Sequence, residues 1–282
     1  MRPWIIEFLR EHGLAGLSWL VPTGGVVYGL TMIAIVLLFL RRSTGVGLPL
    51  SQALSASIAG VTGVIVGGHL YYLLGTGTMA ASGPIDWITQ EGAGSWGGYL
   101  GCMFGMAAYL RWQRAEVWPY LDVLGSVGAL AAVVGRWGCL LFGCDFGRVT
   151  SVPWAVSYPP GSFAYNAHVA SGALSPDAVQ SLAVHPVPVY LSINGLVVYL
   201  LVSAIWRRWR NIPGVTIAAF WVLYGATRFF WEFLRDPAAG GATSGLSLPQ
   251  WMALNAIVVG GAIALVVSRR WRLGAVPAVQ IG

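Results

Sequence analysis

Long apolar segments, separated by short polar ones, dominate the pattern of residues along this chain. A helix needs about 20 apolar residues to cross the hydrocarbon core of a bilayer, and by that measure the pattern predicts seven spans. They cover residues 18–40, 52–74, 95–111, 119–142, 186–206, 214–234 and 249–268. The predicted fold is an all-α polytopic membrane protein with about seven transmembrane helices, in one integral membrane domain over residues 1–282.

Composition and the polar segments refine this prediction. Of the 282 residues, 56% are hydrophobic and only 9% are charged, whereas about a quarter of the residues in a soluble protein are charged. Residues 1–16 mix charged and apolar positions and predict an interfacial amphipathic helix. Residues 75–94 predict a Gly-rich loop. Residues 143–185 form the longest extramembrane segment, for which we expect irregular structure with short strands.

The arginines indicate how the chain is oriented. Most of them follow the first, third, fifth and seventh predicted spans: Arg41, Arg42, Arg111, Arg114, Arg207, Arg208, Arg210, Arg269, Arg270 and Arg272. Because basic residues concentrate in cytoplasmic loops, we predict the amino terminus and residues 143–185 outside the plasma membrane and the carboxy terminus in the cytoplasm. The same loops account for most of the net charge of +6, so this charge does not indicate a nucleic-acid partner.

Two arginines, Arg136 and Arg228, lie inside predicted spans. At a rise of about 1.5 Å per residue they lie roughly 25 Å and 20 Å from the inner ends of their spans, in the outer half of the membrane. A charged side chain at the centre of a membrane helix costs about 2.5–3.5 kcal/mol on insertion scales. Two explanations stay open: the guanidinium group of Arg136 reaches the outer interface, or both arginines hold an anionic headgroup.

The sequence around Arg228 places four polar residues on one helical face. They are Tyr224, Arg228, Glu232 and Arg235, spaced by four, four and three residues. A salt bridge between Arg228 and Glu232 is the structural explanation, but the stripe carries a second arginine and a tyrosine as well. Guanidinium groups bind phosphate in a bidentate manner and stay charged when desolvated, so we predict a phospholipid-phosphate site. Other polar residues expected at this level are Tyr28, His69 and His185.

The cysteines do not indicate a metal site. Cys139 and Cys144 have C-x4-C spacing without a second pair of ligands, and both lie in apolar sequence. Packing of small, polarisable side chains is the preferred interpretation. The sequence therefore predicts no metal at these cysteines.

Several motifs resemble those of the prolipoprotein diacylglyceryl transferase family, over nearly all of the chain. The family signature G-R-x-G-N-F-x-N-x-E-x-x-G resembles residues 135–147, GRWGCLLFGCDFG. The pattern Y-G-x-x-R-x-x-x-E-x-x-R matches residues 224–237, YGATRFFWEFLRDP, in spacing and residue types. Further resemblances are GGVVYGL to the first-span tyrosine motif, SWGGYLG to H-G-G-L-x-G, HPVPVY to H-P-x-Q-L-Y-E, and SLPQ to the segment before the last span.

The resemblance implies transfer of a diacylglyceryl group from phosphatidylglycerol to the thiol of a lipobox cysteine in prolipoprotein signal peptides. It implies a bacterial plasma membrane enzyme that uses membrane lipid as donor and no cofactor. Arg136 and Arg228 are then expected at the phosphate, Tyr28 and Tyr224 at the headgroup or leaving oxygens, and His185 as the candidate base. Residues implied in substrate binding are Arg235, Glu232, Gly147, His69, Gly97, Gly98, Trp96 and Asp145.

The chain also departs from the family pattern. Trp96 stands at the motif histidine, Cys139 and Phe142 at the signature asparagines, and Cys144 at the signature glutamate. Acceptor activation needs a base or a lowered thiol pKa. His69 is therefore a further candidate base beside His185, with Asp145 as an aid. Two alternatives stay open: a related lipid transferase with a different acceptor, and a non-catalytic phospholipid-binding membrane protein.

Overall fold

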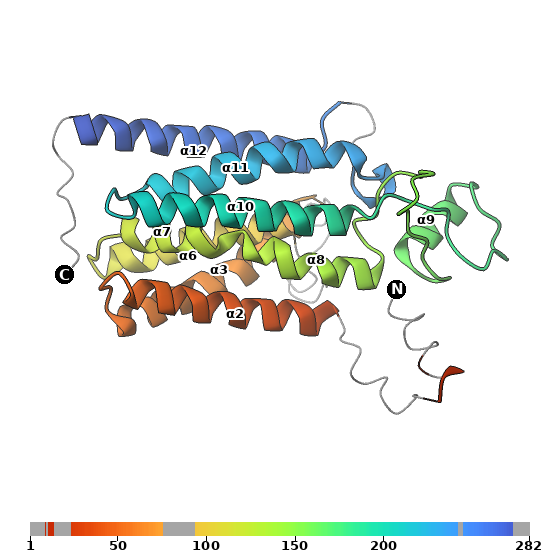
Figure 1. Cartoon of the computed structure of the whole chain (residues 1–282), viewed down its shortest axis with the longest axis horizontal. Coiled ribbons are helices and arrows are strands. Elements are labelled where there is room, and N and C mark those ends of the chain that lie inside the picture. Colours follow the sequence, from red (N-terminus) through yellow and green to blue (C-terminus); the bar gives the residue numbers. More distant parts are fainter. Residues whose placement is uncertain (1–8, 10, 14–23, 76–93, 242–244, 273–282) are drawn as a thin grey trace. The chain divides into compact units, whose positions relative to one another are not determined.

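A computed structural model describes residues 9, 11–13, 24–75, 94–241 and 245–272. The predicted interfacial helix over 1–16 and the predicted loop over 75–94 lie almost entirely outside these residues. The helices are α2 (Gly24–Thr44), α3 (Leu50–Gly75), α6 (Ser95–Trp112), α7 (Trp118–Gly128), α8 (Leu130–Phe142), α9 (Phe163–Ala170), α10 (Val187–Trp209), α11 (Val215–Trp231) and α12 (Leu248–Arg272) (Figure 1). Two short 3-10 helices, η2 (Glu232–Leu234) and η3 (Pro237–Ala239), follow α11.

The helices confirm a polytopic membrane protein. Within the described residues, five helical segments are long and apolar enough to cross a membrane: Val26–Thr44, Leu50–Gly75, Trp118–Phe142, Val187–Trp209 and Leu248–Arg272. The other two predicted spans correspond to α6 and α11, which are helical over 18 and 17 residues. That these two also cross the membrane stays a prediction. The fourth span is interrupted at Ala129, where the backbone stays right-handed (φ −64°, ψ −21°).

The chain divides into two compact units. Unit 1 comprises residues 1–34, 129–198 and 224–254, and unit 2 comprises residues 35–128, 199–223 and 255–282. The prediction of one domain over 1–282 stays a prediction.

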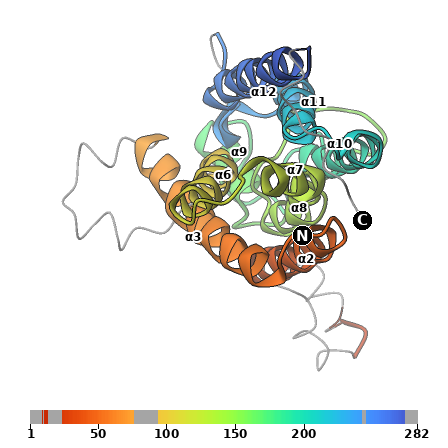
Figure 2. The ribbon, with the colours of Figure 1, turned by 90° about the vertical axis from the view of Figure 1, so that its left-hand side faces the viewer.

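In unit 2, glycines bring α3 and α6 into close contact (Figure 2). A Cβ atom added at Gly97 would lie 2.1 Å from the carbonyl oxygen of Gly67, and one added at Gly101 would lie 2.0 Å from that of Gly63. Glycines four residues apart on each helix therefore let the two backbones touch, as small residues do at helix contacts in membranes.

A buried carboxylate joins α7 to α11 in the same unit. The Oδ2 atom of Asp122 accepts a hydrogen bond from the backbone N–H of Gly214 at 2.6 Å, and its Oδ1 atom accepts one from that of Ile217 at 2.9 Å. The carboxylate thus satisfies N–H groups that the first turn of a helix leaves unpaired.

In unit 1, the segment 143–185 is irregular, as expected, but it also holds the helix α9. Isolated antiparallel bridges pair Val149 with Val184 and Val156 with Val184. A small core of buried side chains holds the segment together: Leu140, Phe146, Tyr158, Ala164 and Val184.

Candidate active site

A tight turn after α8 returns the chain toward Arg136. Gly143 ends the helix in the left-handed region (φ 74°), and its N–H donates to the carbonyl of Cys139 at 2.9 Å. Glycine is favoured there because it carries no Cβ. Asp145 is also left-handed, with φ 56°, a conformation that aspartate tolerates better than most residues. The turn places the carboxylate of Asp145 against the guanidinium of Arg136, nine residues back along the chain.

The next three residues lie between two other segments of unit 1. Residues 146–148 pair with 234–236 through hydrogen bonds from the N–H of Arg148 to Leu234 O (2.9 Å) and from the N–H of Asp236 to Phe146 O (3.1 Å). On the other side, the N–H of Gly147 donates to His185 O at 3.0 Å. A Cβ atom at Gly147 would lie 2.6 Å from both the Cβ and the carbonyl oxygen of His185. The signature glycine is therefore required for this close approach.

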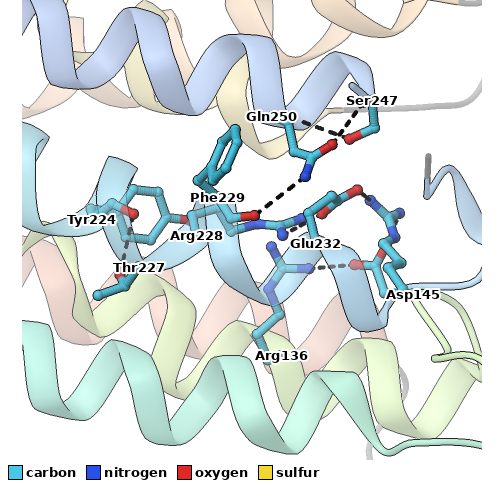
Figure 3. A network of polar contacts seen from close by, with 10 residues as sticks. Arg136, Asp145, Tyr224, Thr227, Arg228, Phe229, Glu232, Ser247 and Gln250 are labelled. Atoms are coloured by element: carbon cyan, nitrogen blue, oxygen red, sulfur yellow. Dashed lines mark hydrogen bonds and ion pairs between the residues drawn. The ribbon is translucent and has the colours of Figure 1, made fainter. Parts of the chain in front are cut away.

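These pairings assemble a row of five charged side chains, called here the arginine–carboxylate cluster: Arg136, Asp145, Arg235, Glu232 and Arg228 (Figure 3). Asp145 bridges two guanidinium groups, because its Oδ2 pairs with Arg136 and its Oδ1 with Arg235. Glu232 bridges the next two: its Oε1 lies 3.3 Å from Nη1 of Arg235, and its Oε2 pairs with Arg228. The predicted i, i+4 pair between Arg228 and Glu232 is therefore present.

Most of this cluster is removed from solvent, and burying charged groups costs free energy unless they are paired. Arg136 and Arg228 are 8% and 3% exposed, and Glu232 is fully buried. Burial raises the pKa of the Asp145 carboxyl, but the positive charges of Arg235 and Arg136 outweigh it and lower this pKa from 3.8 to about 2. Among the described residues, Nε of Arg228 and Nε of Arg235 have no hydrogen-bond partner. Buried donors without a partner are rare, so the cluster is suited to a further anion.

The beginning of α12 supports the arginine-bearing end of α11. Ser247 and Gln250 form a reciprocal capping box: the N–H of Ser247 donates to Oε1 of Gln250 at 2.9 Å, and the N–H of Gln250 donates to Oγ of Ser247 at 3.3 Å. The Nε2 atom of Gln250 also donates to the carbonyl of Phe229 at 3.5 Å, next to Arg228 (Figure 3). The SLPQ motif thus has a structural role in unit 1.

Two tyrosines of the prediction lie in the same unit. The hydroxyl of Tyr28 lies 3.0 Å from Sγ of Cys139, one helical turn after Arg136 on α8. Tyr224 is buried on α11, one turn before Arg228. A hydrogen bond with Cys139 and burial raise the pKa of the Cys144 thiol, which therefore stays protonated. Cys139 is buried and Cys144 is partly buried.

His185 takes part in a chain of hydrogen bonds that the sequence did not predict. Its Nδ1 lies 3.2 Å from the hydroxyl of Tyr190, and that hydroxyl accepts a hydrogen bond from Nε1 of Trp154 at 2.6 Å. The Tyr190 ring lies against Trp231, with centroids 5.4 Å apart. These contacts orient the imidazole through Nδ1. Its other ring nitrogen, Nε2, takes no part in this chain of hydrogen bonds.

Four predicted residues belong to unit 2. Trp96, Gly97 and Gly98 lie at the start of α6, where Gly97 packs directly against the backbone of α3. His69 lies on α3 and stacks on Tyr72, with ring centroids 6.5 Å apart. The close packing against α3 by itself explains why residue 97 is a glycine. A role of these four residues in substrate binding stays a prediction.

Comparisons with known proteins indicate the family of this chain. A family model for prolipoprotein diacylglyceryl transferase matches residues 15–267. The chain is 33% identical over 219 residues to a phosphatidylglycerol–prolipoprotein diacylglyceryl transferase of Burkholderia thailandensis, covering 71% of this chain and 73% of that protein. It is 31% identical over 229 residues to the protein of the same name from Paraburkholderia phymatum, covering 75% of each. The chain belongs to the prolipoprotein diacylglyceryl transferase family.

Relative to the family signature, the exposed-side acid of the arginine–carboxylate cluster stands one residue after the position of the signature glutamate. The glutamate position is Cys144, and the following residue, Asp145, makes the ion pairs. The sequence indicated Asp145 only as a substrate-binding residue or an aid to a base. Its pairing with both Arg136 and Arg235 depends on the left-handed turn and on contacts between segments about ninety residues apart, which no local pattern reveals.

Proposed function

We propose that this member of the family transfers a diacylglyceryl group from phosphatidylglycerol to the thiol of a lipobox cysteine in prolipoproteins. The observation that carries the proposal is the buried arginine–carboxylate cluster, with its unpaired Nε donors, in a multi-pass membrane protein of this family. Both substrates follow from the family, since relatives at 31–33% identity bear the name phosphatidylglycerol–prolipoprotein diacylglyceryl transferase.

The phosphate of the donor lipid is proposed to bind at Arg136 and Arg228. Guanidinium groups suit this role because they bind phosphate oxygens in pairs and stay charged in a dry site. Donors fixed in advance around a developing negative charge stabilise a transition state by about 3–4 kcal/mol each. Arg235, whose side chain is 14% exposed and thus the most accessible of the three arginines, draws the headgroup in, while Tyr28 and Tyr224 donate to headgroup or leaving oxygens.

The reaction is a displacement at carbon. The sulfur of the acceptor thiol attacks the glyceryl carbon that carries the phosphate ester oxygen. A carbon–sulfur bond forms, the carbon–oxygen bond breaks, and the electron pair stays on the oxygen of the departing glycerol phosphate. We assign the thiol proton to Nε2 of His185, whose Nδ1–H then donates to the hydroxyl of Tyr190. This role follows the general-base logic of an activated nucleophile.

The location of the reaction follows from the arginine pattern. We propose the outer side of the bacterial plasma membrane, with the amino terminus outside and the carboxy terminus in the cytoplasm. Residues 143–185 then lie on the side where a prolipoprotein signal peptide emerges from the membrane.

The test is complementation of cells depleted of their own transferase, together with mass spectrometry of a lipobox peptide. We expect a diacylglyceryl adduct from the native chain and a loss of about 10²–10³-fold with Arg228→Ala. The matched control is Arg210→Ala, which removes an arginine that stacks on Trp206 in unit 2 and should leave the yield unchanged. Consumed phosphatidylglycerol with an unmodified peptide would indicate a different acceptor. Retained phosphatidylglycerol binding without consumption would indicate a non-catalytic lipid-binding protein.

A further inference from the structure

The charge of the arginine–carboxylate cluster can be counted from its ion pairs. Three guanidinium groups and two carboxylates are joined in one row, which leaves a net charge of +1. Buried charges are tolerated only when they are compensated. A ligand with a single negative charge would therefore bring the cluster to neutrality, whereas a ligand with two negative charges would exceed it.

Asp145 is the acid that sets this balance at the accessible end of the cluster. Its side chain is 17% exposed, whereas that of Glu232 is fully buried between Arg228 and Arg235. Each of its two oxygens neutralises a different arginine. The backbone adopts an uncommon left-handed conformation at this residue (φ 56°) to bring the carboxylate there. An anion that binds Arg136 or Arg235 therefore lies beside the Asp145 carboxylate.

We propose that Asp145 is a specificity-determining residue that selects a phosphodiester over a phosphomonoester. A phosphodiester such as the phosphatidylglycerol headgroup carries one negative charge, and a phosphomonoester carries up to two because its second pKa lies near 6. By holding the cluster at +1, Asp145 repels the second charge of a monoester. This inference rests on the proposed function, since it takes the headgroup phosphate to bind at the cluster.

The same balance has a consequence for the reaction. Breaking the carbon–oxygen bond turns the bound phosphodiester into glycerol phosphate, a phosphomonoester that gains a negative charge. The Asp145 carboxylate pairs with Arg136, the arginine proposed to hold the phosphate, so its charge favours departure of the product over its retention. Without the Asp145 charge, the cluster would hold glycerol phosphate more tightly, and the product would inhibit the next cycle.

The experiment measures lipid selectivity on the full-length protein in mild detergent at pH 8. Phosphatidylglycerol and phosphatidic acid with identical acyl chains compete against a fluorescent phosphatidylglycerol, for the native chain and for Asp145→Asn. We expect the native chain to prefer phosphatidylglycerol by at least about threefold. In Asp145→Asn the ratio should shift toward phosphatidic acid by about tenfold or more, because one opposing charge is removed at close range. Soluble glycerol phosphate and glycerophosphoglycerol should show the same shift in binding ratio, because the selection acts on the phosphate group and not on the acyl chains.

Two further variants separate selectivity from structure. Asp145→Glu keeps the charge and should keep the ratio even if both lipids bind more weakly. Asp236→Asn is the matched control, because Asp236 lies outside the cluster's ion pairs and its Oδ1 caps the N–H of Ala238 at 2.8 Å, a bond that asparagine can also accept. It should leave the ratio unchanged.

Two results would overturn the inference: a native chain that binds phosphatidic acid as tightly as phosphatidylglycerol, or an unchanged ratio in Asp145→Asn, whether or not that variant binds both lipids more weakly. Neither depends on the adduct assay. A native chain that selects the phosphodiester but forms no peptide adduct would refute the transfer reaction and leave the selectivity in place.

Discussion

Two aspartates, the buried Asp122 in unit 2 and the partly buried Asp145 in unit 1, are stabilised in opposite ways. Asp122 accepts hydrogen bonds from the backbone N–H groups of Gly214 and Ile217, at 2.6 and 2.9 Å. These donors are neutral, and the helix that carries them fixes their positions. Asp145 instead pairs with the side chains of Arg136 and Arg235, which can turn to another anion. An acid held by backbone joins two helices, whereas an acid held by arginines marks a place that a charged ligand can enter.

The two regions also differ in the free-energy cost of burying their charged groups. Hydrogen bonds to a charged group contribute about 1.5–3 kcal/mol each, so Asp122 is compensated locally. The arginine–carboxylate cluster holds three buried and two partly buried charges, and replacing buried ion pairs by apolar groups is often neutral or stabilising. Its presence in an otherwise apolar protein is therefore better explained by function than by stability.

Removing the most buried acid should have the largest effect. Glu232→Gln leaves Arg228 without its ion pair inside a fully buried site, and breaking a buried pair costs about 3–5 kcal/mol. We expect the free energy of unfolding in detergent to fall by this amount. Glu116→Gln, at an exposed acid, should change it by less than about 0.5 kcal/mol. A loss below about 1 kcal/mol in Glu232→Gln would show that the cluster is far less desolvated than its burial indicates.

Acid should weaken the cluster through Asp145. The pKa of this carboxyl is about 2 in the folded protein and 3.8 in its ordinary state. Because the folded pKa is the lower one, the stabilisation is complete above about pH 4 and is lost as the pH falls toward 2. Its size is about 2 kcal/mol. The unfolding free energies of the native chain and Asp145→Asn should therefore differ at pH 6 and converge near pH 2. A difference that stays constant with pH would contradict the ion pairs.

Exchanging the helix-joining acid should have a smaller effect and spare the site. Asp122→Asn keeps one acceptor oxygen but turns an amide N–H₂ toward the other backbone donor. We expect a loss of about 1–2 kcal/mol in unfolding free energy. Phosphatidylglycerol binding by the folded fraction should remain that of the native chain. If binding fell tenfold while the protein stayed folded, the distinction between a structural and a functional acid would not hold.

The span pattern and the Arg228–Glu232 pair could be predicted because both follow from local periodicity. Apolar runs of membrane length are helical in the structure, and a spacing of four residues on a helix brings two side chains together. The glycines of α6 also carry a local signal, since Gly97, Gly101 and Gly105 recur every four residues. A search for small residues at this spacing would have predicted the contact with α3.

Other parts of the site are set by tertiary contacts and leave no periodic trace. The pairing of residues 146–148 with 234–236 positions Asp145 beside Arg235, and it depends on the turn at Gly143. The hydrogen bonds of His185 with Tyr190, and of Tyr190 with Trp154, likewise join residues whose side chains meet only after folding. The arginines within predicted spans were enough to predict a phosphate-binding site. Which acid balances which arginine required the fold.

The smallest expected effect tests how unit 1 supports its charged residues. Ser247→Ala removes one half of the capping box at the start of α12, and loss of such a cap costs about 1 kcal/mol. Gln250 then loses a partner and holds the Phe229 carbonyl less firmly, so lipid binding at Arg228 should weaken by no more than a few fold. The control is Ser268→Ala near the other end of α12, where the exposed hydroxyl bonds only within its own helix, to Leu265 O. If Ser247→Ala and Ser268→Ala lowered the free energy of unfolding equally, the capping box would contribute no more than an ordinary hydroxyl within a helix. The Arg228–Glu232 pair alone would then order this end of α11.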